Sequence, residues 1–173
     1  MLDFLKPLLQ LEQISPRLAR KVWGLAPLLS APFSLALGLK VNTLTDLEVE
    51  VALPATRQNR NEAGFLSASA LIAAGELAGR LLWHRHLQTR TEELNLDGLE
   101  LQNLRPVDSR VHARASWVEA EREQIMRTAR MGERTTYDMN ILFTDARDQA
   151  VGELILKWSL TPKQLVLGAG RPS

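Results

Sequence analysis

Residues 47–53 alternate between apolar side chains and polar or small ones. The apolar positions are Leu47, Val49, Val51 and Leu53, and the residues between them are Glu48, Glu50 and Ala52. A period of two is typical of a β-strand with one buried face. The pattern therefore predicts a strand in this part of the chain.

The same alternation returns in four segments of the second half of the chain. They cover residues 99–107, 110–117, 136–143 and 153–160. Pro106 ends the first of these segments, and a polar connection at residues 88–98 precedes it. Gly132 and the polar residues 145–149 mark turns before and after the third segment. Strands joined by such short turns are typical of an antiparallel meander.

One long helix is predicted between the first strand and the meander. The polar loop NRNEAG, residues 59–64, leads into small and apolar residues that continue to His84, Arg85 and His86. This helix is apolar nearly all round, so the rest of the fold must enclose it. We therefore expect an α+β fold in which a curved antiparallel sheet wraps around one long central helix.

Two shorter helices are predicted near the start of the chain. Asp3 is a suitable first residue for one of them, and Ser15 followed by Pro16 is suitable for the other. These signals give helices over residues 4–13 and 16–29.

The chain has room for one domain with a core. It is 173 residues long, and 45% of its residues are hydrophobic. Pro27 and Pro32 interrupt the helical pattern of the first part. We therefore assign residues 1–32 to an N-terminal helical leader and residues 33–173 to the main domain.

Charge and composition narrow the classes of partner and compartment. The chain has 21 lysine and arginine residues against 20 acidic ones, which gives no reason to expect a nucleic acid partner. It has no cysteine, which excludes disulfides and thiolate chemistry and fits a reducing compartment. The longest nearly uncharged run, residues 65–75, is too short to span a bilayer, and the first residues make a poor secretory signal. We expect a cytoplasmic protein without an integral membrane segment.

A single carboxylate, Glu76, interrupts the apolar helix. Burial of an ionised glutamate is costly unless the carboxylate is paired or hydrogen-bonded, so Glu76 has either a partner or a function. Arg80 lies four residues further on, which is the favourable arrangement for a helical ion pair. A structural ion pair and a carboxylate that faces a substrate therefore both remain open.

The loop and the start of this helix resemble the motif of hotdog-fold thioesterases that hydrolyse acyl-CoA. In those enzymes a polar loop ends in glycine, two residues pass, a His-Gly-Gly turn opens the central helix, and a glutamate or aspartate follows. Here Gly64 ends the loop, and Ser67, Ala68 and Ser69 stand where His-Gly-Gly would stand. Glu76 follows Gly64 by twelve residues, which is the spacing of the glutamate-type branch.

The resemblance covers residues 33–162 and includes the stretch LRPV, residues 104–107, which is similar to a strand end in these proteins. It is closest to a hotdog family of unknown function. The resemblance implies a homodimer, or a dimer of such dimers. In each dimer two sheets join edge to edge, and the active site forms at the subunit interface.

The resemblance also implies a role for each matching position. Glu76 would be the base or nucleophile, and the Ala68 N–H at the start of the helix would stabilise the oxyanion. Asn61 and Ser67 would position the substrate or water, although turn formation by Asn61 and helix capping by Ser67 are equally good explanations. A medium or long fatty acyl group or an aromatic acyl group would lie against Gly64, Phe65, Ser69 and Ile72.

Basic residues suggest where coenzyme A or an acyl-carrier protein would bind. The candidates for the coenzyme A phosphates are Arg57, Arg60 and Arg105. Further basic residues, Arg110, His112 and Arg114, line one strand face, but an exposed sheet face is usually charged. The basic stretch from Arg122 to Arg134 is predicted to be the end of a hairpin, and it would suit the acidic surface of a carrier protein.

The sequence thus favours a thioesterase-like hotdog protein that hydrolyses acyl-CoA or acyl-carrier-protein thioesters. Coenzyme A would enter only as part of the substrate, and no metal is expected because His84 and His86 alone make a weak zinc motif. A non-catalytic module that binds acyl-CoA or an acyl-carrier protein is the second hypothesis, and the missing histidine favours it. A dehydratase would need a histidine near the loop that opens the helix, and no histidine precedes His84.

Overall fold

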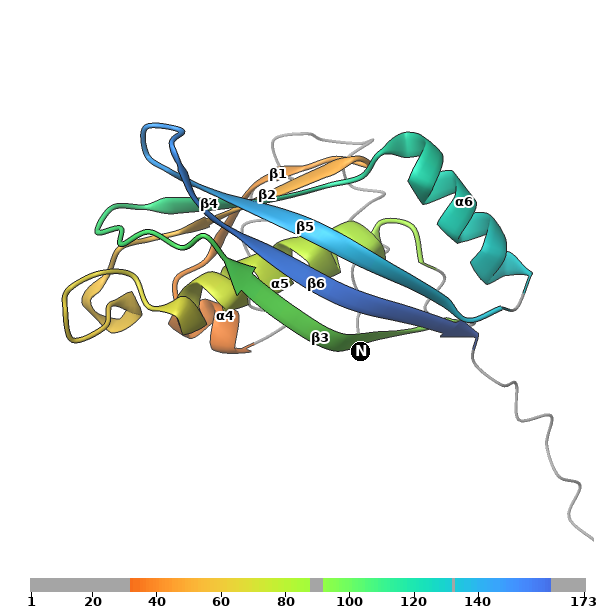
Figure 1. Cartoon of the computed structure of the whole chain (residues 1–173), viewed down its shortest axis with the longest axis horizontal. Helices are drawn as coiled ribbons and strands as arrows, with labels where there is room; N and C mark the ends of the chain where they lie inside the picture. Colours follow the sequence, from red (N-terminus) through yellow and green to blue (C-terminus); the bar gives the residue numbers. More distant parts are fainter. Residues whose placement is uncertain (1–31, 88–91, 132, 163–173) are drawn as a thin grey trace, which may run out of the picture.

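The computed structural model describes residues 32–87, 92–131 and 133–162 (Figure 1). The helices predicted at residues 4–13 and 16–29 lie outside the described residues. The elements in chain order are α4 (Pro32–Ala36), β1 (Lys40–Leu44), β2 (Glu48–Leu53), the 3-10 helix η1 (Arg57–Asn59), α5 (Ala68–His84), β3 (Glu92–Gln102), β4 (Val111–Ser116), α6 (Glu119–Arg130), β5 (Thr135–Asp145) and β6 (Ala150–Pro162).

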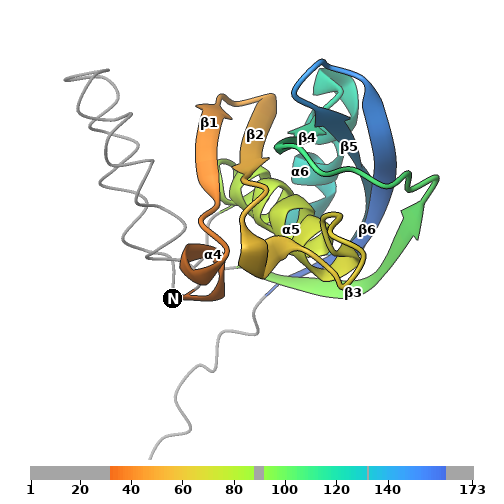
Figure 2. The same ribbon diagram turned by 90° about the vertical axis from the view of Figure 1, so that its left-hand side faces the viewer.

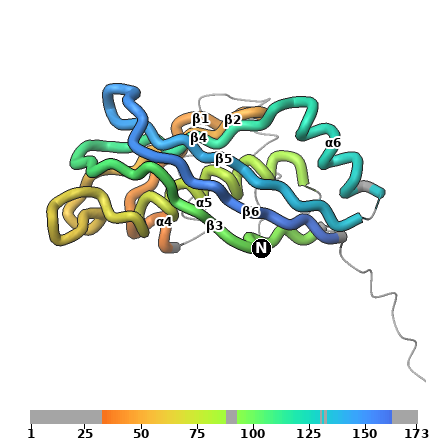
Figure 3. The backbone as a smooth tube through the Cα atoms, in the orientation of Figure 1, coloured from red at the N-terminus to blue at the C-terminus, as the bar shows by residue number. Residues whose placement is uncertain are grey.

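The strands form one antiparallel sheet in the order β1-β2-β4-β5-β6-β3. Seen along the molecule, the sheet curls around α5 (Figure 2). The long strands β5 and β6 run side by side along most of the long axis (Figure 3). The predicted α+β architecture, a curved sheet wrapped around one central helix, is therefore confirmed.

The apolar positions of the alternating segments form the inner face of the sheet, which covers α5. Its buried side chains are Val49, Val51 and Leu53 of β2, Val111, Ala113 and Ala115 of β4, Met139, Ile141 and Phe143 of β5, and Leu154, Leu156 and Trp158 of β6. Nearly all of them are fully buried. Together with one side of α5 they form a single core.

Two glycines bring α5 close to the sheet. A Cβ atom added at Gly75 would lie 2.6 Å from Cδ2 of Leu154 and 3.2 Å from Cζ of Phe143. One turn later, a Cβ atom at Gly79 would lie 3.1 Å from Sδ of Met139. The helix can therefore approach β5 and β6 only where it has no side chain, which explains the glycines within its apolar sequence.

The prediction for β3 is wrong in its position. The sequence pattern assigned residues 88–98 to a polar connection and residues 99–107 to a strand, but β3 begins at Glu92 and ends at Gln102. Leu94 and Leu96 of its first half are only partly buried, because β3 lies at the edge of the sheet and, among the described strands, pairs only with β6. Asn103 then adopts a left-handed backbone conformation with φ of 53° and stops the strand before Pro106.

Three other elements differ from the sequence prediction. Pro32, at which the sequence predicts a break in the helical pattern, is the first residue of the short helix α4, a position that suits proline. Strand β1 was not predicted. The stretch from Arg122 to Arg134 is not a hairpin end, since most of it belongs to α6. Ile125 and Ala129 lie four residues apart on α6 and are buried, which explains the helix.

Candidate functional site

The central helix begins with a hydroxyl cap. Ser67 has an extended backbone, and its Oγ accepts a hydrogen bond of 3.2 Å from the N–H of Ala70. Capping is thus a function of Ser67. The N–H groups of Ala68 and Ser69 have no acceptor among the residues that the structure describes. These N–H groups, at the positive end of the helix dipole, remain available for an anion or a polarised carbonyl.

The polar loop before the helix is closed by Asn61. Its Oδ1 accepts a hydrogen bond of 3.1 Å from the N–H of Phe65, and its own N–H donates to the Phe65 carbonyl at 2.7 Å. Gly64 supplies the left-handed conformation of this turn, with φ of 85°. Asn61 is therefore a turn residue, while its exposed side-chain NH₂ has no acceptor within the described part of the chain.

Asn59 anchors this loop to the body of the protein. Its side chain is fully buried and donates to the carbonyls of Leu37 at 2.9 Å and Pro54 at 2.8 Å. Its carbonyl accepts a hydrogen bond of 2.8 Å from the N–H of Ser67. The position of the helix start thus depends on Asn59, a role that a polar loop residue does not reveal in the sequence.

Glu76 and Arg80 form an ion pair on α5. Nη2 of Arg80 lies 2.5 Å from Oε1 of Glu76, and each side chain is 36% exposed. The Arg80 guanidinium also lies over the ring of Trp158, 5.6 Å from its centroid. Oε2 of Glu76 has no hydrogen-bond partner among the residues described here. The ion pair therefore exists, and it leaves one carboxylate oxygen free.

Glu76 belongs to a stripe of α5 that the sheet leaves partly open. The stripe contains Ser69, Ile72, Glu76, Arg80 and His84, all of them exposed or partly exposed. Most other positions of the helix are buried. The stripe therefore brings Ser69 and Ile72 of the predicted acyl pocket onto the same face as Glu76. Phe65, 37% exposed, precedes this face in the loop, beside Gly64.

His84 completes the stripe as a partly buried, neutral side chain. Burial, and to a smaller extent the charge of Arg80, lower its pKa to about 4, so His84 is neutral at pH 7. In the described part of the chain, no cluster of three or more histidine and acidic side chains could hold a metal ion.

Two of the three arginines predicted to contact coenzyme A are engaged by the protein itself. Arg60 donates to the carbonyls of Ala55, Gly64 and Asp108. Arg105 donates to the carboxylate of Asp145 at 2.7 Å and to the carbonyl of Ala150 at 2.6 Å. The third candidate for the coenzyme A phosphates, Arg57 in η1, is exposed. Its guanidinium has no partner among the described residues.

The outer face of β1, β2 and β4 carries a charged cluster around Glu50. Its carboxylate bonds to Arg114 at 2.8 Å, His112 at 2.9 Å and Asn42 at 3.0 Å. Although burial acts against ionisation, the hydrogen bonds from these three side chains lower the pKa of Glu50 to about 2. His112 and Arg114 thus have partners on the sheet surface.

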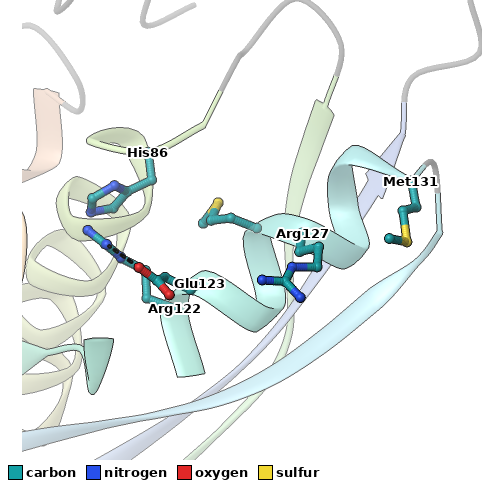
Figure 4. A pocket seen from close by; sticks show the side chains of 6 residues that line it. His86, Arg122, Glu123, Arg127 and Met131 are labelled. Atoms are coloured by element: carbon teal, nitrogen blue, oxygen red, sulfur yellow. Dashed lines mark ion pairs between the residues drawn. The ribbon is translucent and has the colours of Figure 1, made fainter. Parts of the chain in front are cut away.

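A cavity of about 610 Å³ lies at the far end of α5, away from Glu76. It is lined by His86, just after α5, and by Arg122, Glu123, Met126, Arg127 and Met131 on and after α6 (Figure 4). Glu123 and Arg122 are paired across 3.9 Å at its edge. The cavity and the open stripe are separate features.

No helix in the described part of the chain is long and apolar enough to cross a membrane.

Solved structures share this fold. A Pseudomonas aeruginosa protein of unknown function, called a probable thioesterase, is 20% identical, with a TM-score of 0.76 over 83% of this chain and 95% of that one. A Haemophilus influenzae thioesterase is 19% identical, with a TM-score of 0.65 over 85% of this chain and 92% of that one. A variant of a hypothetical Staphylococcus aureus protein is 17% identical, with a TM-score of 0.62 over 76% and 99% of the two chains.

These likenesses establish that the chain has the hotdog fold. No curated protein matches the chain at a significant level. The family described as "Domain of unknown function (DUF4442)" matches residues 21–160, which is most of the chain. The protein therefore belongs to the DUF4442 family.

Proposed function

We propose that this protein is a thioesterase that hydrolyses acyl-CoA or acyl-carrier-protein thioesters in the cytoplasm, with Glu76 as the base. The observation that carries the proposal is the open stripe of α5. A helix otherwise enclosed by the sheet exposes one carboxylate, with one free oxygen, beside small and apolar side chains. Two solved structures with the same fold are called a probable thioesterase and a thioesterase, which supports thioester hydrolysis as the reaction.

Hydrolysis at this site needs no group beyond water and the thioester. The free oxygen of Glu76 accepts a proton from water, and the water oxygen bonds to the thioester carbonyl carbon. The carbonyl electron pair moves to the oxygen, where helix N–H groups stabilise the charge. When the carbonyl re-forms, the carbon–sulfur bond breaks. The sulfur leaves with the electron pair and takes the proton from Glu76, which yields a thiol and a carboxylic acid.

The positions of Glu76 and Ala68 on α5 favour a site shared by two subunits. They are eight residues apart, which is about 12 Å along a helix axis, so one subunit cannot bring both onto one thioester. Two antiparallel copies of α5 that cross near Ile72 would place Glu76 of one subunit opposite Ala68 of the other. The proposed homodimer therefore has two equivalent sites, each built from both subunits.

The edge strand β3 offers the contact for this dimer. It is 11 residues long and, among the described strands, pairs only with β6. Long unpaired edges are usually covered in native proteins, because they attract other strands. Leu99, 43% exposed, adds apolar surface to this edge. Pairing of two β3 edges would join the sheets edge to edge.

The spacing of Asn61 and Glu76 gives further support. They are fifteen residues apart. Two structures of the Staphylococcus aureus protein carry a replaced glutamate and a replaced glutamine, also fifteen positions apart in that protein. We infer that the free carboxamide NH₂ of Asn61 contacts the substrate or water, while its oxygen holds the turn.

The decisive experiment compares the native protein with Glu76→Gln on acyl-CoA substrates of graded chain length, with thiol release as the readout. We expect turnover by the native protein and a loss of kcat of about two to four orders of magnitude in the variant, which is the range of general-base catalysis. Because Glu76 and Arg80 are each one-third exposed, their ion pair stabilises the fold little, and both proteins should melt at similar temperatures. Equal turnover in both proteins would remove Glu76 from the mechanism.

The second candidate function is a module that binds acyl thioesters without hydrolysis. The capping bond of Ser67, at the position of the histidine in the resembling enzymes, favours it. Saturable binding of acyl-CoA by isothermal titration calorimetry, with no thiol release at any chain length, would support this function instead.

A further inference from the structure

The Arg80 guanidinium has unused hydrogen-bond donors directly beside Glu76. Nη2 donates to Glu76, and Nε and Nη1 have no acceptor among the residues that the structure describes. We propose that Arg80 is a catalytic residue that donates a hydrogen bond to the thioester oxygen as negative charge develops there. This inference rests on the proposed function, because it concerns the same site.

Arg80 is held in place from two sides. Its Nη2 is 2.5 Å from Glu76, and its guanidinium carbon is 5.6 Å from the centroid of the Trp158 ring. Trp158 is itself fully buried in β6, so the surface under the guanidinium is rigid. A planar guanidinium fixed by a carboxylate and an aromatic face keeps its remaining N–H groups in one direction. Preorganised donors of this kind stabilise a developing oxyanion most strongly.

Arg80 brings a full positive charge beside Glu76, which the start of the helix does not. Ser67 stands where the resembling enzymes have histidine, and its hydroxyl is neutral and accepts the N–H of Ala70. A guanidinium group, by contrast, carries a positive charge that is spread over its three nitrogens. Arg80 lies four residues beyond Glu76, about 6 Å along the helix, so a carbonyl bound next to the free oxygen of Glu76 is within its reach.

The role of Arg80 can be stated for each step of hydrolysis. When the water oxygen adds to the carbonyl carbon, the charge on the carbonyl oxygen is shared between an Arg80 N–H and the Ala68 N–H of the other subunit. When the carbon–sulfur bond breaks, the carbonyl forms again and both hydrogen bonds weaken. The thiolate takes its proton from Glu76, and Arg80 stays protonated throughout.

The test uses the full chain with the substitutions Arg80→Met, Arg80→Lys and Arg80→Ala. We expect Arg80→Met to lower kcat about 10²–10³-fold, as the loss of one oxyanion donor does, with a much smaller change in KM. Arg80→Lys keeps the charge but not the planar fork, so its kcat should be intermediate. Methylguanidinium at millimolar concentration should restore part of the kcat of Arg80→Ala. Arg147→Met, which removes an exposed cation from the turn between β5 and β6, is the control and should keep the native kcat.

A second substitution, Ala68→Pro, separates the two proposed donors. Proline is favoured at the first helical position, and Ser67 before it already has the extended conformation that precedes proline, with φ of −74° and ψ of 146°. Since the Ala68 N–H has no acceptor among the described residues, its loss breaks no hydrogen bond within them. Ala68→Pro should therefore lower kcat without unfolding the protein, and the Arg80→Met variant should lose further activity when Ala68→Pro is added.

The outcomes distinguish this inference from the proposed function. A native kcat in Arg80→Met, together with an inactive Glu76→Gln, would overturn the role of Arg80 and leave the thioesterase in place. A raised KM and a lowered melting temperature in Arg80→Met, together with no rescue of Arg80→Ala by methylguanidinium, would show a structural role only, and would also overturn it. No turnover by the native protein on any thioester would overturn both proposals.

Discussion

The carbonyl of Asn59 accepts a hydrogen bond of 2.8 Å from the backbone N–H of Ser67, the residue that caps the central helix. Asn59 is fully buried and also donates to Leu37, just after α4, and to Pro54, just after β2. The side chain of Asn59 thus joins two segments, and its backbone carbonyl ties the start of α5 to them. The geometry of the candidate site depends on this connection.

We therefore expect Asn59→Ala to destabilise the fold by about 2–4 kcal/mol, because it leaves two buried carbonyls without their donor. Chemical denaturation would measure the change in the free energy of unfolding. Asn61→Ala is the matched control, since Asn61 is exposed and its side chain accepts only one hydrogen bond in the described structure. A loss of stability as large in Asn61→Ala as in Asn59→Ala would contradict this assignment.

The close approach of α5 to the sheet leads to a second prediction. Gly75→Ala adds a methyl group 2.6 Å from Leu154, so it should destabilise the protein by about 1–3 kcal/mol even though alanine favours helices. The measurement is the midpoint of thermal unfolding. Gly98→Ala in β3 is the control, because the nearest atom to its added Cβ lies 3.8 Å away, and this variant should unfold close to the native temperature.

The cluster around Glu50 predicts how stability depends on pH. The pKa of Glu50 falls from its ordinary value of 4.5 to about 2, so its contribution to stability is present above pH 4.5 and is lost as the pH falls towards 2. Glu50→Gln removes this contribution. The stability difference between the native protein and Glu50→Gln should therefore be largest near neutral pH and shrink between pH 4.5 and 2. A difference that stays constant over this range in urea denaturation would exclude the proposed linkage.

The sequence predicted those parts of the fold in which local pattern and burial agree. The alternation at residues 47–53 located β2, because Val49, Val51 and Leu53 of this strand face the core. It could not locate the first half of β3, because an edge strand exposes more of both faces and Leu94 is only partly buried there. In α6, charged residues outnumber the buried Ile125 and Ala129. The few apolar positions were too weak a periodic pattern to predict a helix.

The candidate site was predictable in its positions but not in its contacts. The spacing from Gly64 placed Glu76 on the central helix, and the helix start at Ala68 is where the motif predicts it. Arg80 lies four residues after Glu76, and this spacing alone predicts that the two side chains pair. The same spacing brings Arg80 close enough to a substrate at Glu76 to act as a donor. Its packing on Trp158 joins α5 to a strand more than seventy residues away, and no local pattern reports such a contact.

The edge of β3 gives the last prediction, which concerns assembly. If two copies pair through β3, Leu99→Lys should yield a monomer, because lysine replaces an apolar side chain, 43% exposed, at the proposed contact and discourages strand pairing. Leu142→Lys is the control, since Leu142 is similarly exposed, at 39%, but lies on β5 between β4 and β6. Size-exclusion chromatography with light scattering should show a native dimer, a dimer for Leu142→Lys and a monomer for Leu99→Lys. Because each proposed site needs Glu76 of one subunit and Ala68 of the other, the monomer should also lose thiol release, and an active monomer would refute the shared site.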